Sequence, residues 1–461
     1  MRDFLPSDVR KREYVIGIIK EVYESYGFEP LETPAVENLE TLTGKYGEEG
    51  NQLIYKILKR GEKLEQSRSE KELSDLALRY DLTVPLARVV ANHKNDLPKF
   101  FKRYQIQPVW RADRPARGRY REFYQCDVDA IGSSSMIVEA ELCAAVSEIL
   151  TRLGFKDFVI RINHRMFLEK LLSHLEIPVE KQIDALVAID KLDKIGIDGV
   201  SEELKKREIS TKSITDLIGI FKFMLGLLTP INLIEMVDPS SIGEINQGFN
   251  KEFLSQMSGE FQTDSFLIPG LADLRQILEL ANFLGCFSRI RIDPTLVRGL
   301  SYYTGAIFEI NVPDLAGSLG GGGRYDGLIG MFGKEQIPAC GFSLGLERIL
   351  VVMEERGMFP KELETNSADV LITIWNEESI GESLKLAGEL RQQGLRVLVY
   401  PEADKLGKQF KYASIINVPF VCVLGETELA ENKVTLKNMQ TGEQETVLRG
   451  DIVSKLKGLP L

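Results

Sequence analysis

The chain is poor in the residues that mark several common protein classes. It has only three histidines, none at the spacing of metal ligands, and five scattered cysteines without a Cys-x-x-Cys pair. This pattern predicts no metal site and reduced thiols in a cytoplasmic protein. No apolar run approaches the roughly 18 residues of a membrane helix, and residues 1–6 lack the apolar core of a signal peptide, so no membrane partner is expected.

The chain also lacks an excess of basic residues. Its net charge is −11 over 461 residues, whereas proteins that bind nucleic acid are usually basic. Any contact with RNA must therefore come from local basic surface. With 44% hydrophobic and 27% charged residues the composition is that of a globular protein, and the length predicts two or three domains.

The N-terminal part is predicted to combine a helix with a hairpin. Residues 6–26 have the pattern of an amphipathic helix that stops at Gly27, and an extended segment follows over 28–36. Residues 100–131 contain two strand-like runs around a loop at 113–118, which predicts a long hairpin. The apolar positions of the helix are Val15, Ile18, Ile19, Val22 and Tyr26.

The rest of the chain changes character several times. Residues 163–284 show leucine- and lysine-rich helical patterns and are predicted to be a helical insertion, and residues 288–356 return to strands, a glycine run and a closing helix. Residues 362–367 are expected to be a linker. Beyond it, an order that predicts a parallel sheet in a separate domain is formed by strands at 370–375, 396–400 and 420–424 and helices at 379–393 and 405–416.

The second strand of the hairpin is predicted to place polar side chains on one face. Residues two apart share a face of a strand, and a face with arginines, a ring and carboxylates is costly unless something polar occupies it. Guanidinium groups suit phosphate oxygens, and a ring can stack on a base. A solvated face with surface ion pairs is the open alternative. The face comprises Arg119, Arg121, Phe123, Gln125, Asp127 and Asp129, and the incoming strand adds Arg111 followed by Asp113.

A glycine run at 320–323 invites comparison with phosphate-binding loops. Neither a Gly-Lys-Ser/Thr sequence nor the Gly-x-Gly-x-x-Gly spacing occurs there, so neither nucleotide fingerprint applies. A tight connection that lets the backbone approach a ligand and a flexible turn are both compatible with these residues.

Two further arginines stand in informative positions. Residues 341–348 are expected to open a helix with Arg348 in its first turn, where a cation opposes the helix dipole and needs an anionic partner. That partner is a ligand, the neighbouring Glu347 or a neighbouring helix. Arg298 precedes Tyr302 and Tyr303 at the expected start of a strand, where alternation predicts that one tyrosine lines a pocket and the other packs.

In this order the segments resemble the three motifs of class II aminoacyl-tRNA synthetases. The N-terminal helix with residues 28–34 matches the first motif, and Gly345-Leu346-Glu347-Arg348 matches the third. The second is matched by Arg111-x-Asp113, a loop, and Arg119-x-x-x-Phe123.

Further segments resemble the histidine-specific family within that class. Residues 298–305 and 321–327 are similar to its two signatures, and residues 78–85 and 118–127 are similar to its eukaryotic-style branch. Ser301 departs from the pattern, because the family usually has aspartate there.

The resemblance implies an α/β and α+β multidomain fold. An antiparallel-sheet catalytic domain would span 1–162 and 285–360, interrupted by the helical insertion 163–284, and a βαβαβ anticodon-binding domain would span 367–461. It also implies a homodimer that forms histidyl-adenylate from L-histidine and ATP, with Mg²⁺ accompanying ATP, and passes the histidyl group to tRNA(His).

The resemblance also assigns roles to individual residues. Arg111 and Arg298 would be catalytic, flanking the α-phosphate of ATP. ATP would be bound by Arg111, Asp113, Arg119, Phe123 and Arg348. Histidine would be bound by Asp81, Leu82, Thr83, Gln125, Asp129, Tyr302, Tyr303 and Tyr325. Contacts with tRNA are expected from Arg114, Arg117, Lys405, Lys408 and Lys411, although lysines at this spacing also occur on solvated helix faces.

Two other classes of function compete with this interpretation. A paralogue of the family is a non-catalytic regulatory subunit of ATP phosphoribosyltransferase, but it typically lacks the signature arginine and the anticodon domain, which this sequence retains. A pure RNA-binding protein on the same scaffold would not need the catalytic arginines.

Overall fold

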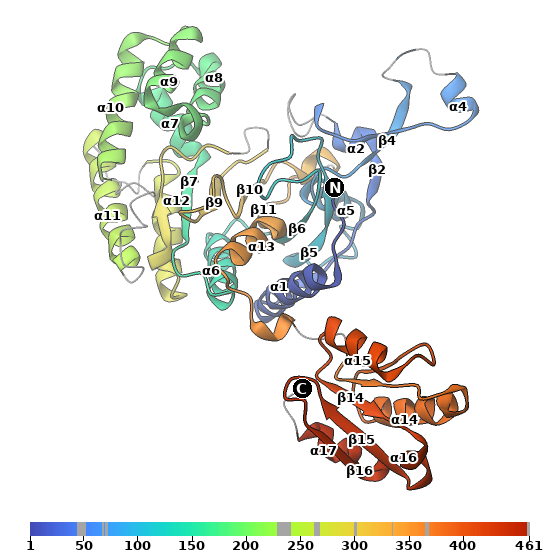
Figure 1. Cartoon of the computed structure of the whole chain (residues 1–461). Helices are drawn as coiled ribbons and strands as arrows, with labels where there is room; N and C mark the ends of the chain where they lie inside the picture. The colour runs from blue at the N-terminus through green and yellow to red at the C-terminus, as the bar shows by residue number, and fades with distance from the viewer. Residues whose placement is uncertain are drawn as a thin grey trace. The chain divides into compact units, whose positions relative to one another are not determined.

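The chain folds into two units, Met1–Phe359 and Pro360–Leu461. The computed structural model describes residues 1–43, 52–66, 69, 72–227, 241–261, 268–298, 302–333, 335–364 and 368–458 (Figure 1). Within these ranges no helix has the length and apolar character needed to cross a membrane.

A central sheet carries the first unit, and its described strands follow the order β1-β5-β6-β11-β10-β9-β7-β8. Neighbouring strands are antiparallel except at the two edges, where β1 runs parallel to β5 and β7 parallel to β8. The bounds are β1 Glu29–Pro30, β5 Phe101–Trp110, β6 Glu122–Ile131, β7 Val159–His164, β8 Ile290–Ile292, β9 Ala306–Asn311, β10 Gly320–Arg324 and β11 Ala339–Gly345.

The register of the strands gives the sheet one apolar and one polar face. On the apolar face Val128 stands opposite Phe342, and Phe308 opposite Ile162. These side chains are buried in the main core. The helices that contribute to this core and pack against one another and the sheet are α1 (Pro6–Ser25), α6 (Ile137–Arg152), α12 (Leu271–Phe283) and α13 (Leu346–Glu355).

The predicted N-terminal helix is confirmed as α1. Val15, Ile19 and Val22 are fully buried, so the apolar stripe of α1 packs inside its own unit. The helix ends at Ser25, and Gly27 adopts a φ of +75°, a conformation that suits glycine after a helix.

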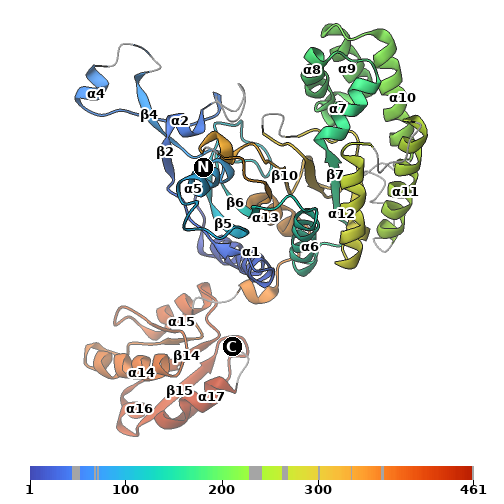
Figure 2. The ribbon, with the colours of Figure 1, turned by 180° about the vertical axis from the view of Figure 1, so that it is seen from behind.

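Helices also dominate the middle of the chain, as predicted. Strand β7 extends to His164, so these helices begin at Arg165 rather than at Asn163. Figures 1 and 2 both show them grouped beside β7 at one side of the central sheet. Their bounds are α7 Arg165–His174, α8 Val179–Ile189, α9 Leu192–Lys206, α10 Thr211–Leu227 and α11 Ile242–Glu260.

A smaller sheet lies between α1 and the hairpin in sequence. Its strands pair in the order β2-β4-β3, and the segment after β4 leads directly into α5. The elements are β2 Val36–Asn38, α2 Leu39–Leu42, β3 Lys56–Leu58, α4 Glu62–Glu65, β4 Ser74–Leu78 and α5 Thr83–Asn92.

The glycine run forms a strand, so both interpretations of it as a connection or turn are wrong. Gly320–Arg324 is β10, which pairs with β9 on one side and β11 on the other. A Cβ atom added to Gly322 would lie 2.0 Å from the carbonyl oxygen of Gly341. Absence of side chains therefore permits close packing of backbones at the centre of the sheet.

The second unit contains the predicted alternation of strands and helices and two additional strands. β12 (Val370–Ile372) runs parallel to both β13 (Val397–Val399) and β14 (Phe420–Val423). Antiparallel strands β15 (Lys433–Asn438) and β16 (Gln444–Leu448) then make the sheet mixed rather than wholly parallel. The helices are α14 Ile380–Gln392, α15 Leu406–Ile415, α16 Glu426–Ala430 and α17 Ile452–Lys457.

The predicted linker at 362–367 is partly structured. Lys361–Glu364 forms a 3₁₀ helix, and residues 365–367 lie outside the described ranges.

We predict that Gly322→Ala destabilises the central sheet by about 1–3 kcal/mol, because the new methyl group meets fixed backbone atoms. Gly327→Ala is the matched control, since nothing lies within 4 Å of the methyl group that it adds. Calorimetry of both variants should show a lower thermal midpoint only for Gly322→Ala, and equal midpoints would contradict the steric argument.

Candidate active site

The polar face of the central sheet forms the floor of the candidate site. Asp127 of β6 stands opposite Gln105 of β5 and Ser343 of β11, and Gly321 of β10 pairs with Ser343 from the other side. The missing side chains leave space above the floor. A Cβ at Gly321 would lie 1.8 Å from the Nη1 of Arg298, and one at Gly341 would lie 1.9 Å from the Oδ1 of Asp129.

The predicted alternation along the second hairpin strand is correct only from Phe123 onward. Strand β6 begins at Glu122, so Arg119 and Arg121 belong to the preceding loop, where Asp113 binds both. Arg119 donates two hydrogen bonds of 3.1 Å to its carboxylate, and Arg121 donates to its carbonyl oxygen at 3.3 Å. Asp127 and Asp129 are each 2% exposed, so the alternative of a solvated face is wrong for this part of the strand, whereas Arg119 is exposed and ion-paired as that alternative predicts.

Four arginines from three parts of the first unit share one region of positive potential. Burial lowers the pKa of Arg348, and the nearby charges of Arg298, Arg119 and Arg111 lower it further. Asp113 and Glu309 balance part of this charge through their ion pairs with Arg119 and Arg298, and the remaining positive charge suits an anionic ligand. The arrangement matches the phosphate groups of a nucleotide.

Arg348 does not use Glu347 as its partner, which removes one alternative left open by the sequence. Arg348 donates to the carbonyl oxygen of Ser318, on the side of the arginine cluster. Glu347 instead accepts from Arg12 of α1 at 2.8 Å and from the backbone nitrogen of Tyr124 at 2.9 Å.

Arg298 is held beside the glycine strand by two groups. Its Nε lies 3.1 Å from the Oε2 of Glu309, and its Nη2 donates to the hydroxyl of Ser318 at 3.2 Å. The expected strand start at Arg298 is wrong, because β9 begins only at Ala306. Gly299, Leu300 and the unusual Ser301 lie outside the described residues.

Two buried side chains of β7 fix the segment that leads to Arg298. Arg161 donates to the carboxylate of Asp293 at 2.6 Å, and Asn163 donates to the carbonyl oxygen of Leu296 at 3.0 Å. Asp293 also accepts from the hydroxyl of Thr295 at 2.6 Å. The sequence did not single out these residues, since their partners lie more than 130 positions away.

A group of tyrosines and buried carboxylates lies next to the arginine cluster, connected to it through Arg111 and Gln125. The hydroxyl of Tyr325 donates to the buried carboxylate of Asp129. The ring centroid of Tyr302 lies 6.4 Å from that of Tyr325 and 4.6 Å from that of Tyr303. Burial raises the pKa of Tyr303 to about 12. Tyr302 and Tyr303 both belong to one aromatic group, and they precede β9, so the strand alternation expected to divide them into a lining and a packing residue does not apply.

Arg111 bridges the two regions. Its Nε donates to the carbonyl oxygen of Tyr80 at 3.0 Å, and its Nη2 donates to the Oε1 of Gln125 at 3.4 Å. Its guanidinium carbon lies 5.1 Å from the ring centroid of Phe123. Gln125 also donates to the hydroxyl of Ser343 at 2.8 Å, which fixes its amide on the floor of the pocket.

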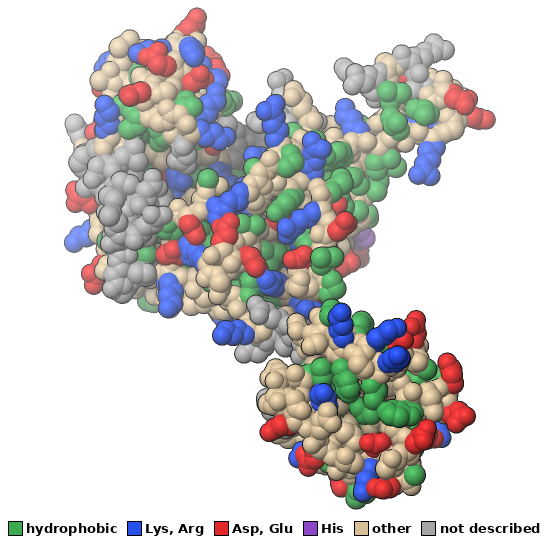
Figure 3. Space-filling view, in the orientation of Figure 1, with side chains coloured by type: hydrophobic (Ala, Val, Ile, Leu, Met, Phe, Trp, Pro, Cys, Tyr) green, Lys and Arg blue, Asp and Glu red, His purple; other side chains and the backbone are tan. Residues whose placement is uncertain are grey.

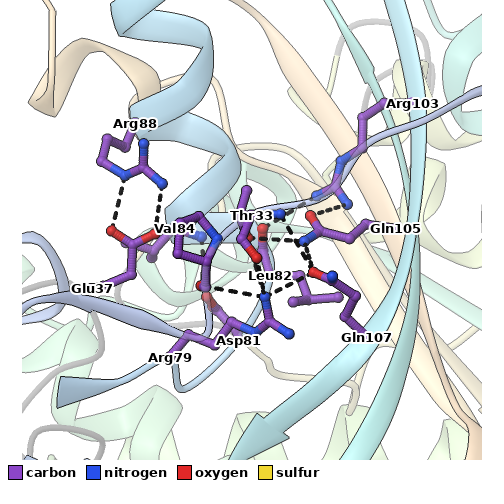
Figure 4. Close-up of polar contacts among 11 residues, drawn as sticks. Thr33, Glu37, Arg79, Asp81, Leu82, Val84, Arg88, Arg103, Gln105 and Gln107 are labelled. Atoms are coloured by element: carbon purple, nitrogen blue, oxygen red, sulfur yellow. Dashed lines mark hydrogen bonds and ion pairs between the residues drawn. The ribbon is translucent and has the colours of Figure 1, made fainter.

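The segment between β4 and α5 closes the pocket on another side. It holds Asp81, Leu82 and Thr83, and Asp81 caps the start of α5 by accepting from the backbone nitrogen of Val84 at 3.1 Å. Figure 4 shows the polar side chains behind this segment, which include Arg79, Arg103 and Gln105. Arg103, Gln105 and Gln107 repeat at every second position of β5. This alternation of polar residues is visible in the sequence, although none of the three is among the predicted site residues.

The residues expected to contact tRNA are divided between the two units of the chain. Arg114 is exposed on the hairpin loop, and Arg117 on the same loop forms an ion pair with Glu355. Lys405, Lys408 and Lys411 are exposed on the second unit, at the start and along the outer side of α15. Lys408 also pairs with Asp404 at 2.8 Å. Figure 3 shows basic side chains gathered over α15.

The described part of the chain has no cluster of three or more histidine, cysteine, aspartate or glutamate side chains arranged to hold a metal ion. The five cysteines are all buried and unpaired.

Comparisons with known proteins agree with this architecture. The family described as histidyl-tRNA synthetase matches residues 1–225 and 245–349, and the family described as an anticodon binding domain matches 369–459. A histidine–tRNA ligase of Bacteroides fragilis is 40% identical over 467 residues, covering 99% of this chain and 97% of the relative. One from Porphyromonas gingivalis is 42% identical, covering 96% and 95%.

Solved structures give the same result. The crystal structure of histidyl-tRNA synthetase from Nostoc sp. superposes with a TM-score of 0.74 at 33% identity, covering 99% of this chain and 97% of that one. A Bacillus halodurans structure described as an ATP phosphoribosyltransferase regulatory subunit/histidyl-tRNA synthetase has a TM-score of 0.70 at 23% identity, which shows a shared fold only. The family match over both parts of the first unit, together with full-length relatives, places this chain in the histidyl-tRNA synthetase family of class II aminoacyl-tRNA synthetases.

Proposed function

We propose that this chain attaches L-histidine to tRNA(His) in two steps that use ATP. The carboxylate of histidine attacks the α-phosphorus of ATP, giving histidyl-adenylate and releasing pyrophosphate. A hydroxyl of the 3′-terminal ribose of tRNA then attacks the histidyl carbonyl and releases AMP. The observation that carries the proposal is the arginine cluster lying beside two buried carboxylates, Asp127 and Asp129, to which Arg111 is linked through Gln125.

The arginine cluster would bind the triphosphate. Arg111 and Arg298 would flank the α-phosphate and neutralise the charge that develops there, which is usually the largest contribution to catalysis of such transfers. Arg119 and Arg348 would hold the outer phosphates, and Phe123 would stack on adenine. The support is mutual proximity of the four guanidinium groups and the contact of Arg111 with the ring of Phe123. Asp113, which orients Arg119, completes this set.

Magnesium would come to the site with ATP. The described residues supply no preformed cage of carboxylates, and Mg²⁺ commonly takes one or two carboxylates and completes its coordination with phosphates and water. Glu309 and Asp113 are carboxylates that lie among the phosphate-binding arginines, through their ion pairs with Arg298 and Arg119. The bound ion would withdraw charge from the phosphates.

The group of tyrosines and buried carboxylates would bind histidine. Asp81 and Gln125 would receive the ammonium group, while Asp129 would accept from the imidazole with Tyr302, Tyr303 and Tyr325 around it. Leu82 and Thr83 complete the wall. The Oδ2 of Asp129 lies 2.8 Å from the Nη2 of Arg103, and its Oδ1 accepts from the hydroxyl of Tyr325, so the carboxylate is held in a fixed position beside the three tyrosines. A pocket that hydrogen-bonds the ring rejects amino acids without such groups.

A regulatory subunit of ATP phosphoribosyltransferase is not favoured as an alternative. The chain retains Arg298 and the whole second unit, and relatives that match it from end to end are histidine–tRNA ligases.

We predict that Arg298→Ala and Arg111→Ala each lower kcat for histidine-dependent ATP–pyrophosphate exchange by at least about a hundredfold, with smaller changes in KM for histidine. Each variant removes a charge that is used mainly in the transition state. Arg152→Ala is the control, because Arg152 forms exposed ion pairs on α6 away from the site. Wild-type exchange in either site variant would remove that arginine from the proposed mechanism.

The second unit would bind the anticodon, with Lys405, Lys408 and Lys411 on the contacting surface, and Arg114 and Arg117 would approach the acceptor end. The support is the exposure of the three lysines along α15 and the family match of this unit. In open sheets of this type, ligands gather at the carboxyl ends of parallel strands, where α15 begins after β13.

We expect replacement of the three lysines by alanine to raise KM for tRNA and to flatten its dependence on salt, because fewer phosphate contacts release fewer counterions. Exchange of ATP and pyrophosphate without tRNA should stay unchanged. The control replaces Lys385, Lys433 and Lys455, which are ion-paired elsewhere on the same unit. A tRNA salt dependence equal to that of the control would exclude the α15 lysines from the interface.

The chain would act as a homodimer in the cytoplasm. Val36 and Leu76 are exposed and lie on one face of the small sheet, by the register of β2 and β4, and Leu58 is exposed where the register of β3 becomes irregular. Figure 3 shows apolar side chains along this region. Exposed apolar patches of this kind commonly mark protein interfaces. The apolar stripe of α1 cannot form part of a dimer interface, because it is buried in the core of its own unit.

Sedimentation at micromolar concentration should show a dimer for the wild-type chain and a monomer for the double variant Leu58→Asp with Leu76→Asp. Phe283→Asp is the control, because Phe283 is an apolar residue that is 86% exposed on α12. A wild-type monomer, or a double variant that sediments as the control does, would contradict the interface.

A further inference from the structure

Arg103 is a fully buried charged residue that has no part in the proposed binding of ATP, histidine or tRNA. Its side chain is 0% exposed on β5, directly opposite Asp129 of β6. The Nη2 of Arg103 lies 2.8 Å from the Oδ2 of Asp129. Removal of a guanidinium from water is costly, so a pairing at this depth needs compensation from several partners.

The other contacts of Arg103 are with the segment before α5 and with Gln105 on its own strand. Its Nη2 donates to the carbonyl oxygen of Leu82 at 3.3 Å, and its Nη1 donates to the Oε1 of Gln105 at 3.2 Å (Figure 4). One guanidinium therefore joins Asp129 on the floor to the segment that holds Asp81 and Leu82.

A second buried arginine holds the beginning of the same segment. Arg79 donates to the carbonyl oxygens of Thr33 at 2.6 Å and Pro108 at 2.8 Å. Gln105 donates to the hydroxyl of Thr33 at 2.9 Å, which connects the two arginines through one network (Figure 4). Arg79 faces backbone carbonyls, whereas Arg103 faces the carboxylates of the pocket.

The charges around Arg103 are predominantly negative. Asp127 and Asp129 face it from β6 and Asp81 from the segment before α5, while the hydroxyls of Tyr325 and, across the sheet, Tyr23 complete its titratable surroundings. Burial raises the pKa of Asp127 to about 7, and the positive charge of Arg103 opposes that rise. The same two effects act on the pKa of Asp129, where burial again dominates.

We propose that Arg103 is a positioning residue that supplies the positive charge beside Asp127 and Asp129 and ties Asp129 to the backbone of Leu82, so that these carboxylates can receive the ammonium group and the ring N–H of the amino acid. The inference rests on the proposed function, because histidine is the ligand through which it is observed. Arg103 does not touch the substrate in this proposal. It acts through the charge state and placement of the carboxylates.

The test compares Arg103→Met, which removes the charge, with Arg103→Lys, which keeps it but loses the fork of hydrogen bonds. Arg291→Met is the matched control, because Arg291 is 1% exposed and lies on the edge strand β8 of the same sheet. Six strand spacings separate β8 from β5, or roughly 29 Å. KM for histidine and kcat are measured by ATP–pyrophosphate exchange from pH 6.5 to 9, with the wild-type chain in parallel.

For Arg103→Met we expect KM for histidine to rise at least tenfold at pH 7 and to return toward the wild-type value as pH increases. Without the cation the carboxylates stay protonated to higher pH, so the pH at which histidine binds well should move up by about one to three units. Arg103→Lys should keep the wild-type pH profile with a smaller rise in KM, and Arg291→Met should follow the wild-type chain.

A KM that rises equally at every pH in Arg103→Met would show a merely structural role and overturn the inference. A wild-type chain without histidine-dependent exchange would overturn the proposed function and the inference with it. If Arg103→Met unfolds, the cause should be an uncompensated Asp129, and Asp129→Asn in the same chain should restore the thermal midpoint. Failure of that second substitution to restore it would contradict the pairing.

Discussion

Burial of charge on one face of the central sheet is the constraint that shapes the first unit. Arg103 and Asp129, Arg161 and Asp293, and Arg298 and Glu309 are paired across strands or adjoining segments of this face. A charge taken out of water is tolerated only where it has a partner or a ligand. Most of these pairs hold a segment that carries a proposed site residue. The same interactions therefore stabilise this face of the sheet and fix the positions of the site residues. Arg298 is both paired in this way and one of the four arginines proposed to bind phosphate.

Small side chains are the second requirement of this face. Gly321 leaves room for Arg298, Gly323 for the ring of Tyr303, and Gly341 for the carboxylate of Asp129. On the opposite face large apolar side chains fill the same strands and pack under the helices. The apolar face of the sheet is therefore covered by helices, whereas the polar face carries the site residues. Alternation of side chains along a strand makes this division possible without additional loops.

The pairing of β6 with β11 brings two distant parts of the sequence into one site. Residues 81–129 supply one half and residues 298–348 the other, with the helices α7 to α12 between them. Glu347 reinforces the junction, because it binds Arg12 of α1 and the backbone of Tyr124 at once. An insertion between the two halves is tolerated because it leaves and rejoins the sheet at neighbouring strands, β7 and β8.

Local pattern alone determined α1, both strands of the hairpin, the alternating elements of the second unit and most of the polar residues proposed for the site. Helical spacing, strand alternation and turn residues act over a few positions, so they are legible in the sequence. The tertiary structure decided what depends on distant partners. The glycine run became a central strand because β9 and β11 lie on either side of it. Arg119 left the strand alternation because Asp113 holds it in the loop. Glu347 pairs with Arg12, 335 positions away. Arg103 became a candidate positioning residue only because the strand register places it opposite Asp129. These outcomes depend on burial and long-range pairing, whose free energies no short window of sequence contains.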